Sequence, residues 1–273
     1  MKQIIVAIDF SRCSIHSLEY AITVANTMDA NIIMTWVDIS DRADTAFQGI
    51  EDHPRKEIVN NFEELIQKYG KTLKGDLTYK IRKGKVHFEI ANQAKYSDTM
   101  LVIAGTHGVS GFEEFWIGSN AYRIVSHAPC PVITVRSDFE TTRSINTIVL
   151  PIDSSLESRQ KLPFTTKMAK LFDSKVHIIS LYSTSIKAIR NRIDNYTNQV
   201  ETFLKEEGVQ HIVKKVEAEN ITNATINYAK SVDADIISIM TEQETSSANL
   251  FLGAYAQQMV NHSPIPVLCI RTQ

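Results

Sequence analysis

A glycine-rich stretch in the first half of the chain has the composition and spacing of a phosphate-binding loop. Residues 105–108 (GTHG) follow the strand-like apolar run 101–104, and Gly118 and Ser119 come after nine more residues, before a segment with helical character. The first turn of a helix has unpaired amide N–H groups and partial positive charge, so it favours an anion. Glycines let the main chain approach that anion closely, and the Ser119 hydroxyl adds a donor. The pattern therefore predicts phosphate binding between a strand and a helix.

The same glycines have a simpler interpretation, because tight turns need glycine whatever the protein does. Neither the P-loop pattern Gly-x4-Gly-Lys-Ser/Thr nor the dinucleotide pattern Gly-x-Gly-x-x-Gly occurs in the chain. Their absence from the sequence argues against a fast ATPase and against NAD binding.

Two titratable residues near this loop have competing interpretations. Asp9 follows the apolar run 4–8, so its carboxylate either meets a ligand at the end of that strand or caps the helix that begins near Ser11. His107 lies within the loop, but the sequence places no nucleophile or carboxylate partner beside it. We interpret His107 as a loop histidine near phosphate and not as an acid–base catalyst.

The composition disfavours several classes of partner. The chain of 273 residues has 29 Lys and Arg against 31 Asp and Glu, which removes the usual electrostatic case for binding nucleic acid or an anionic membrane. Its three cysteines are far apart without Cys-x-x-Cys spacing, so neither a disulfide framework nor a zinc site is indicated. No apolar run has the length of a membrane span, and the N-terminus resembles a strand more than a signal peptide. We expect a cytoplasmic protein with no nucleic-acid partner and no membrane contact.

The chain repeats itself once. Residues 4–11 (IIVAIDFS) match 148–155 (IVLPIDSS), and residues 127–133 match 262–268. A repeat of this length indicates a duplicated domain and not a solenoid.

The polar segment 137–145 lacks an apolar period and is the natural linker between the copies. We therefore expect one domain over residues 1–137 and a second domain over residues 144–273. The long connection 39–54 in the first copy is either a lid or a partner contact.

Both copies have the pattern of a doubly wound α/β domain, because short apolar runs alternate with amphipathic segments. Four helices are expected in each copy, and the capping-box spacing Ser154-x-x-Glu157 predicts the start of a helix after the first strand of the second copy. We predict an α/β fold of two tandem doubly wound domains, each with a five-stranded parallel sheet. The expected strands are 3–9, 31–37, 77–82, 99–104 and 131–135 in the first copy, and 146–152, 175–181, 210–216, 235–239 and 266–270 in the second.

The segment 105–136 resembles the ATP-binding members of the universal stress protein family. It carries Gly-x2-Gly-x9-Gly-Ser followed by a Cys-Pro-Val strand, and the resemblance covers essentially the whole chain as a tandem universal stress protein. It implies the sheet order 3-2-1-4-5 in each domain, with ATP bound across the carboxyl ends of strands 1 and 4. General reasoning on open α/β sheets selects the same crevice.

The resemblance also implies a set of nucleotide contacts. Asp9 would face the nucleoside, the backbone at Val37 would meet the adenine edge, and the glycines with Ser119 would lie along the ribose and phosphates, accompanied by Mg²⁺. Asn120 stands where the family pattern frequently has valine, so its role is open. The full set of expected contacts is Asp9, Val37, Gly105, His107, Gly108, Gly118, Ser119 and Asn120.

The second copy has lost most of this loop, since Met, Gln and Ala replace two glycines and the serine. The two longer side chains would occupy space that a phosphate needs, and alanine offers no hydroxyl. We therefore predict one nucleotide per chain, in the first domain. The equivalents of Gly105, Gly108, Gly118 and Ser119 are Met240, Gln243, Gly253 and Ala254.

These patterns predict a stress-response protein that binds ATP in its first domain and acts as a regulatory or interaction module. The loop supplies amides and a hydroxyl but no lysine, so we expect at most a slow ATPase. The resemblance implies a pseudo-dimer of the two copies through their last strands, and we expect the whole chain to pair again as a homodimer and to have an unidentified protein partner.

Two alternatives stay open. One is a nucleotide-independent interaction or scaffold protein in which the glycines serve only the turn. The other is an adenylyl-transfer enzyme of a related α/β fold, which ranks low because residues 9–12 (DFSR) stand where His-x-Gly-His would be expected.

Overall fold

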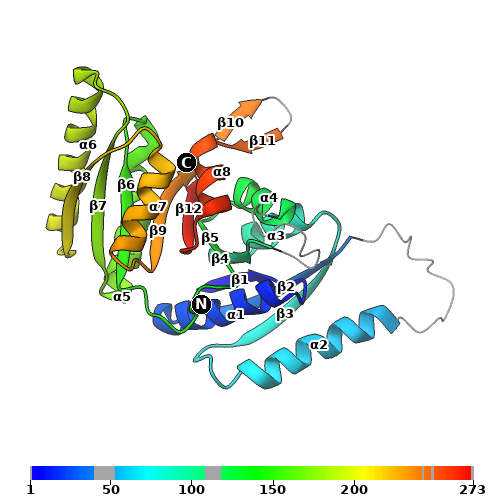
Figure 1. Cartoon of the computed structure of the whole chain (residues 1–273). Helices are drawn as coiled ribbons and strands as arrows, with labels where there is room; N and C mark the ends of the chain where they lie inside the picture. The colour runs from blue at the N-terminus through cyan, green and yellow to red at the C-terminus, as the bar shows by residue number, and fades with distance from the viewer. Residues whose placement is uncertain (1, 40–52, 108–117, 242, 247–248, 272–273) are drawn as a thin grey trace.

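The computed structural model describes residues 2–39, 53–107, 118–241, 243–246 and 249–271. Each half alternates strands and helices as expected, and the ten predicted strands are confirmed to within three residues at their ends (Figure 1). The first half contains β1 (Gln3–Ala7), α1 (Arg12–Met28), β2 (Asn31–Asp38), α2 (His53–Tyr69), β3 (Leu77–Lys83), α3 (Val86–Tyr96), β4 (Thr99–Gly105), α4 (Ser119–His127) and β5 (Val132–Val135).

The second half repeats this order with two additions, a 3₁₀ helix and a two-stranded hairpin. Neither addition was expected from the sequence. Its elements are β6 (Thr147–Ile152), the 3₁₀ helix η1 (Leu156–Arg159), α5 (Leu162–Phe172), β7 (Lys175–Tyr182), α6 (Lys187–Glu206), β8 (His211–Glu217), α7 (Ile221–Ser231), β9 (Ile236–Thr241), β10 (Gln243–Ser246), β11 (Asn249–Leu252), α8 (Ala254–His262) and β12 (Val267–Arg271).

The ten main strands form one continuous sheet in the order β3-β2-β1-β4-β5-β12-β9-β6-β7-β8. The predicted order 3-2-1-4-5 is therefore confirmed in both halves. Strands within each half are parallel, whereas β5 and β12 pair antiparallel with Ile133 opposite Leu268. The two copies thus meet through their last strands and share a sheet, as the expected pseudo-dimer requires.

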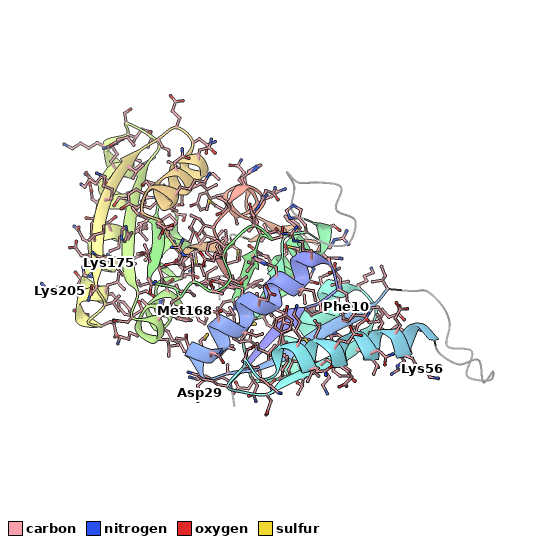
Figure 2. All side chains as sticks on the ribbon, turned by 60° about the horizontal axis from the view of Figure 1, so that its bottom comes forward. Phe10, Asp29, Lys56, Met168, Lys175 and Lys205 are labelled. Atoms are coloured by element: carbon pink, nitrogen blue, oxygen red, sulfur yellow. The ribbon has the colours of Figure 1, made fainter. Side chains whose placement is uncertain are left out.

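Helices cover both faces of this sheet, and its central strands are buried on both sides, whereas the outermost strands β3 and β8 are largely exposed. In β1, Ile4, Ile5 and Val6 are all fully buried, with Ile4 and Val6 on one face and Ile5 on the other, as the two-residue period of a strand dictates. Figure 2 labels Met168 of α5, which is also fully buried and belongs to a core cluster that includes residues of both halves.

The prediction that an α-helix begins at the capping-box spacing directly after β6 is wrong. The segment Leu156–Arg159 is a short 3₁₀ helix without a side-chain cap, and α5 begins only at Leu162. In the first half the equivalent helix α1 begins at Arg12, capped by Ser11. The two halves therefore differ where the first strand passes into the first helix.

The β10–β11 hairpin stands between β9 and α8, at the place in the second half that the glycine loop occupies in the first. Its strands pair antiparallel from Gln243 opposite Leu252 to Ser246 opposite Asn249. The Leu252 N–H donates to the Tyr122 hydroxyl of α4 at 3.2 Å. The hairpin therefore ties the second half to α4 of the first half (Figure 1).

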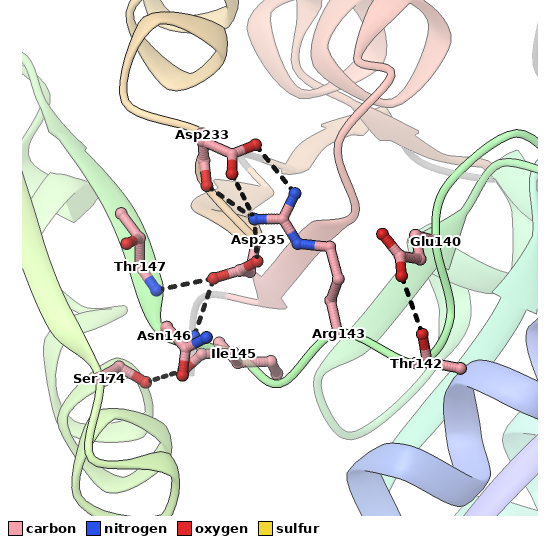
Figure 3. A network of polar contacts seen from close by, with 9 residues as sticks. All are labelled: Glu140, Thr142, Arg143, Ile145, Asn146, Thr147, Ser174, Asp233 and Asp235. Atoms are coloured by element: carbon pink, nitrogen blue, oxygen red, sulfur yellow. Dashed lines mark hydrogen bonds and ion pairs between the residues drawn. The ribbon is translucent and has the colours of Figure 1, made fainter.

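The segment between β5 and β6 is anchored in the second half by a buried carboxylate (Figure 3). Asp235 accepts hydrogen bonds from the Asn146 and Thr147 N–H groups at 2.8 and 2.9 Å. Arg143 forms an ion pair with Asp235 at 2.8 Å and donates two hydrogen bonds to the carboxylate of Asp233. The Asp235 side chain is only 3% exposed, so Arg143 supplies the positive charge that a buried anion needs.

Arg143→Ala is expected to destabilise the protein by about 2–3 kcal/mol, because it leaves Asp235 buried without its ion pair. The cost stays at the lower end because the Arg143 side chain is 28% exposed and water can approach after its removal. Urea unfolding of the full chain measures the effect. The matched control is Arg190→Ala, which breaks the exposed bidentate pair with Glu217 and should change stability much less. Equal losses from both variants would contradict this assignment.

Two predictions, on Gly108 and on the 39–54 connection, concern residues that the structure does not describe. Gly108 and most of the 39–54 connection lie outside the described residues. Within the residues that are described, no helix is both long and apolar enough to cross a membrane.

Candidate functional site

The carboxyl ends of β1, β2 and β4 and the amino end of α4 surround a pocket of about 170 Å³. It lies where the strand order reverses between β1 and β4, the usual ligand site of open α/β sheets. Small-molecule sites typically have volumes of about 300–1,000 Å³. This pocket is smaller, so a bound nucleotide would extend beyond the volume that the described residues enclose. Seven of the eight expected contacts line the pocket, and Gly108 falls outside the described residues. These seven are Asp9, Val37, Gly105, His107, Gly118, Ser119 and Asn120.

Asp9 fixes the turn between β1 and α1. Its Oδ1 accepts a hydrogen bond from the Ser11 N–H at 3.0 Å, while the Ser11 hydroxyl caps the helix by accepting from the Ser14 N–H at 3.2 Å. Asp153 has the same role in the second half, where its Oδ1 accepts from the Ser155 N–H at 2.9 Å. The repeat of aspartate in both copies therefore has a structural cause. Oδ2 of Asp9 has no hydrogen bond within the described chain.

Phe10 holds the Asp9 turn in an unusual backbone conformation. Its φ is 62°, in the left-handed region that is unfavourable for a residue with a side chain. Its ring packs edge-on against Phe62 at 5.0 Å, and Phe62 stacks on Tyr79 at 4.6 Å. These contacts offset the strain, and Figure 2 shows Phe10 at the entrance to α1.

Gly105 ends β4 beneath the first turn of α1. A Cβ at this position would lie 2.8 Å from Cys13 Sγ and 3.1 Å from the Cys13 carbonyl carbon and oxygen. Helix packing therefore requires the glycine, which is a different reason from the expected one of clearance for phosphate. The second half has Met240 here, and this substitution fits the later start of its first helix at Leu162.

The amino end of α4 has no side-chain cap. The N–H of its N-cap residue Gly118 donates to the Thr106 carbonyl at 2.7 Å, so this amide is already used. The next three amides, of Ser119, Asn120 and Ala121, have no acceptor in the helix, and all three residues line the pocket. The partial positive charge of the helix terminus therefore lies at the pocket wall.

His107 is half-buried at the same end of the pocket. Its Nδ1 lies 2.8 Å from the Thr106 hydroxyl, whereas Nε2 is buried and has no hydrogen-bond partner in the described chain. The described lining contains no Lys or Arg, so the His107 ring is the basic side chain among these residues. This arrangement suits a hydrogen bond to an anionic ligand group.

Thr35 on β2 is a lining residue that the sequence reasoning missed. It is 1% exposed, and its Oγ1 has no hydrogen-bond partner in the described chain. It lies two residues before Val37, so the strand period places both side chains on one face of the sheet. The two-residue period of the strand was the signal in the sequence that could have indicated Thr35 as a second lining residue. Trp36, Val86 and Ile124 add apolar surface to the lining.

A histidine pair lies next to this wall, on α3 and α4. The rings of His87 and His127 are 4.6 Å apart, and His127 Nδ1 donates to the Arg123 carbonyl at 2.8 Å. Burial lowers the pKa of His87, and the positive groups of His127, Arg123 and Lys85 lower it further. The folded protein therefore favours neutral His87.

We expect His87 to make the protein less stable at acidic pH. The unfolded chain binds a proton at His87 near pH 6.5, whereas the folded chain resists it, so stability falls as the pH drops through about 6.5. Chemical unfolding at pH 7.5 and 5.5 measures this loss. His87→Phe should show a smaller loss between these pH values than the parent protein, and an unchanged loss would contradict the assignment.

The equivalent region of the second half contains a tyrosine. Tyr255, which replaces Asn120, is half-buried, and its hydroxyl lies 3.2 Å from Thr225 Oγ1. Burial raises the pKa of this phenol, and the nearby Asp153 carboxylate raises it as well. Tyr255 therefore occupies the neighbourhood of Asp153 that corresponds to the pocket around Asp9.

The fold and the pocket define a tandem α/β protein with a ligand pocket at the strand switch point of its first half. The model of the Universal stress protein family matches residues 1–136 and 144–271. The chain therefore belongs to the universal stress protein family, and it carries two copies of that family's domain.

Individual relatives agree with this assignment. A protein of Staphylococcus aureus (strain USA300) named as a universal stress protein is 28% identical over 146 residues, which are 50% of this chain and 85% of that protein. The crystal structure of a universal stress protein from Archaeoglobus fulgidus DSM 4304 superposes with a TM-score of 0.77 at 18% identity and covers 98% of both chains. A functionally unknown protein from Pseudomonas aeruginosa PAO1 has a TM-score of 0.68 at 16% identity, with 98% of this chain and 92% of that chain covered. These structures share the tandem fold.

Proposed function

We propose that the first half of the chain binds ATP in the pocket between β1 and β4, and that the protein works as a regulatory or interaction module of the stress response. The observation that carries this proposal is the uncapped amino end of α4, whose three amides meet a pocket that also contains Asp9. Phosphate groups suit the amides, and ribose hydroxyls suit a carboxylate oxygen. Membership of the family supports a nucleotide as the ligand class.

In this proposal, the protein hydrolyses ATP slowly if at all. Fast phosphoryl transfer needs fixed cations around the γ-phosphate and a group that orients water. The described lining offers His107 and helix amides instead of a lysine or arginine. Within the described residues, no group of three or more His, Cys, Asp or Glu side chains is arranged to hold a metal ion. Any Mg²⁺ in the proposal therefore arrives with the phosphates.

The proposal extends to the whole chain. It places one nucleotide in the domain 1–137 and none in the domain 144–273, because Met240 and Tyr255 replace Gly105 and Asn120 there. The protein would act in the cytoplasm as a homodimer with a further protein partner. The shared sheet makes the second half a fixed neighbour of the nucleotide site.

Thermal unfolding of the full chain with ATP tests this proposal. A ligand that binds only the folded state adds about 2.7 kcal/mol of stability at 100 times its Kd, so ATP at millimolar concentration should raise the Tm. GTP at the same concentration and ionic strength is the control for non-specific anion binding. No rise with ATP would favour the nucleotide-independent interaction protein.

A further inference from the structure

Thr35 presents a polar group for which the described part of the chain has no partner. Thr35 is only 1% exposed, and its Oγ1 has no hydrogen bond in the described chain. Such an unpaired buried hydroxyl is destabilising, and most buried polar groups avoid it. Thr35 nevertheless lines the pocket, so a ligand can supply the missing partner.

The position of Thr35 in the sheet indicates which part of a ligand it would meet. Thr35 is level with Ala7 on β1, and Val6 beside it is level with Ile103 on β4. Neighbouring strands are about 4.8 Å apart, so Thr35 lies roughly 10 Å across the sheet from the end of β4. A ligand with its phosphates at α4 would therefore direct its other end toward β2.

We propose that Thr35 is a specificity-determining residue whose Oγ1 hydrogen-bonds to the base of the bound nucleotide. This inference rests on the proposed function. A hydroxyl donates and accepts, so it fits a ring nitrogen or an exocyclic amine of a purine. Oγ1 is closed to solvent in the free protein, so the proposed contact requires rotation of χ1 to another staggered position.

Thr35→Val tests the proposal, because valine keeps the shape of threonine and removes the hydroxyl. We expect ATP affinity to fall roughly tenfold in a calorimetric titration, as the loss of one hydrogen bond predicts. The unliganded variant should be as stable as the parent or more stable, because the unpaired polar atom is gone. Thr35→Ser keeps the hydroxyl and should retain affinity within about threefold of the parent.

Thr166→Val is the matched control. Thr166 on α5 is 3% exposed and its Oγ1 also has no partner in the described chain, but it lies in the second half. Removing this hydroxyl should change stability in the same direction and leave ATP affinity unchanged.

Three outcomes would overturn the inference. Parent-like ATP affinity of Thr35→Val would show that the hydroxyl makes no ligand contact. Equal weakening by Thr35→Val and Thr35→Ser would show that side-chain shape, not the hydroxyl, matters. No ATP binding by the parent protein would remove the proposed function itself, and this inference with it.

Discussion

Gly118→Val is expected to abolish ATP binding and to leave the fold intact. Gly118 has φ −58° and ψ 141°, an extended backbone that valine adopts readily. The added side chain would stand in the pocket wall, directly before the α4 amides that have no acceptor within the helix. We expect affinity to fall at least about 100-fold in a calorimetric titration. An unchanged circular dichroism spectrum would confirm that the variant folds.

The chain provides a closely matched control in Gly253→Val. Gly253 is the N-cap of α8, has φ −56° and ψ 152°, and likewise lacks a side-chain cap. If the first half alone binds nucleotide, this variant keeps the affinity of the parent protein. Equal loss of binding from the two substitutions would refute the one-site account.

Gly105→Ala should destabilise the protein by about 2–3 kcal/mol, the usual cost of overpacking a tight site. The new methyl group would come within 2.8 Å of Cys13 Sγ and 3.1 Å of the Cys13 main chain, in the first turn of α1. Either the helix or the end of β4 must move, and both border the pocket. Urea unfolding measures the cost, and ATP affinity should fall with it.

A double-mutant cycle with Cys13→Ala separates this clash from other effects of the new methyl group. Because Sγ is the nearest atom, Gly105→Ala should cost less in the Cys13→Ala background, with a coupling of at least about 0.5 kcal/mol. Additive losses would show that the cysteine side chain does not limit the space, and stability within about 0.5 kcal/mol of the parent would contradict the packing role of Gly105.

The strands could be predicted because their cause is local, whereas the sheet order was implied by the family resemblance. Strands buried on both faces, such as β1 and β4, are continuous apolar runs, and duplication of the domain made each run visible twice. The start of the first helix in the second half was not predicted correctly, because the local sequence pattern indicated an earlier start than Leu162. The capping-box pattern at Ser154 is such a local signal, but the segment it precedes forms a short 3₁₀ helix without a side-chain cap.

The position of the candidate site was also predictable, since glycine spacing and strand order both indicate the end of β4. The reasons for individual residues were less accessible. Gly105 makes room for Cys13, and the Gly118 amide bonds to Thr106, and both facts need coordinates. Thr35 was missed because a lone threonine in an apolar strand gives no sign of whether its hydroxyl is paired.

A crystal structure of the full chain with ATP would test the central claim most directly. The account predicts phosphate oxygens within hydrogen-bond distance of the Ser119, Asn120 and Ala121 amides, and the base beside β2. It predicts no nucleotide beside Asp153. Phosphates bound elsewhere, or a second nucleotide in the other half, would contradict it.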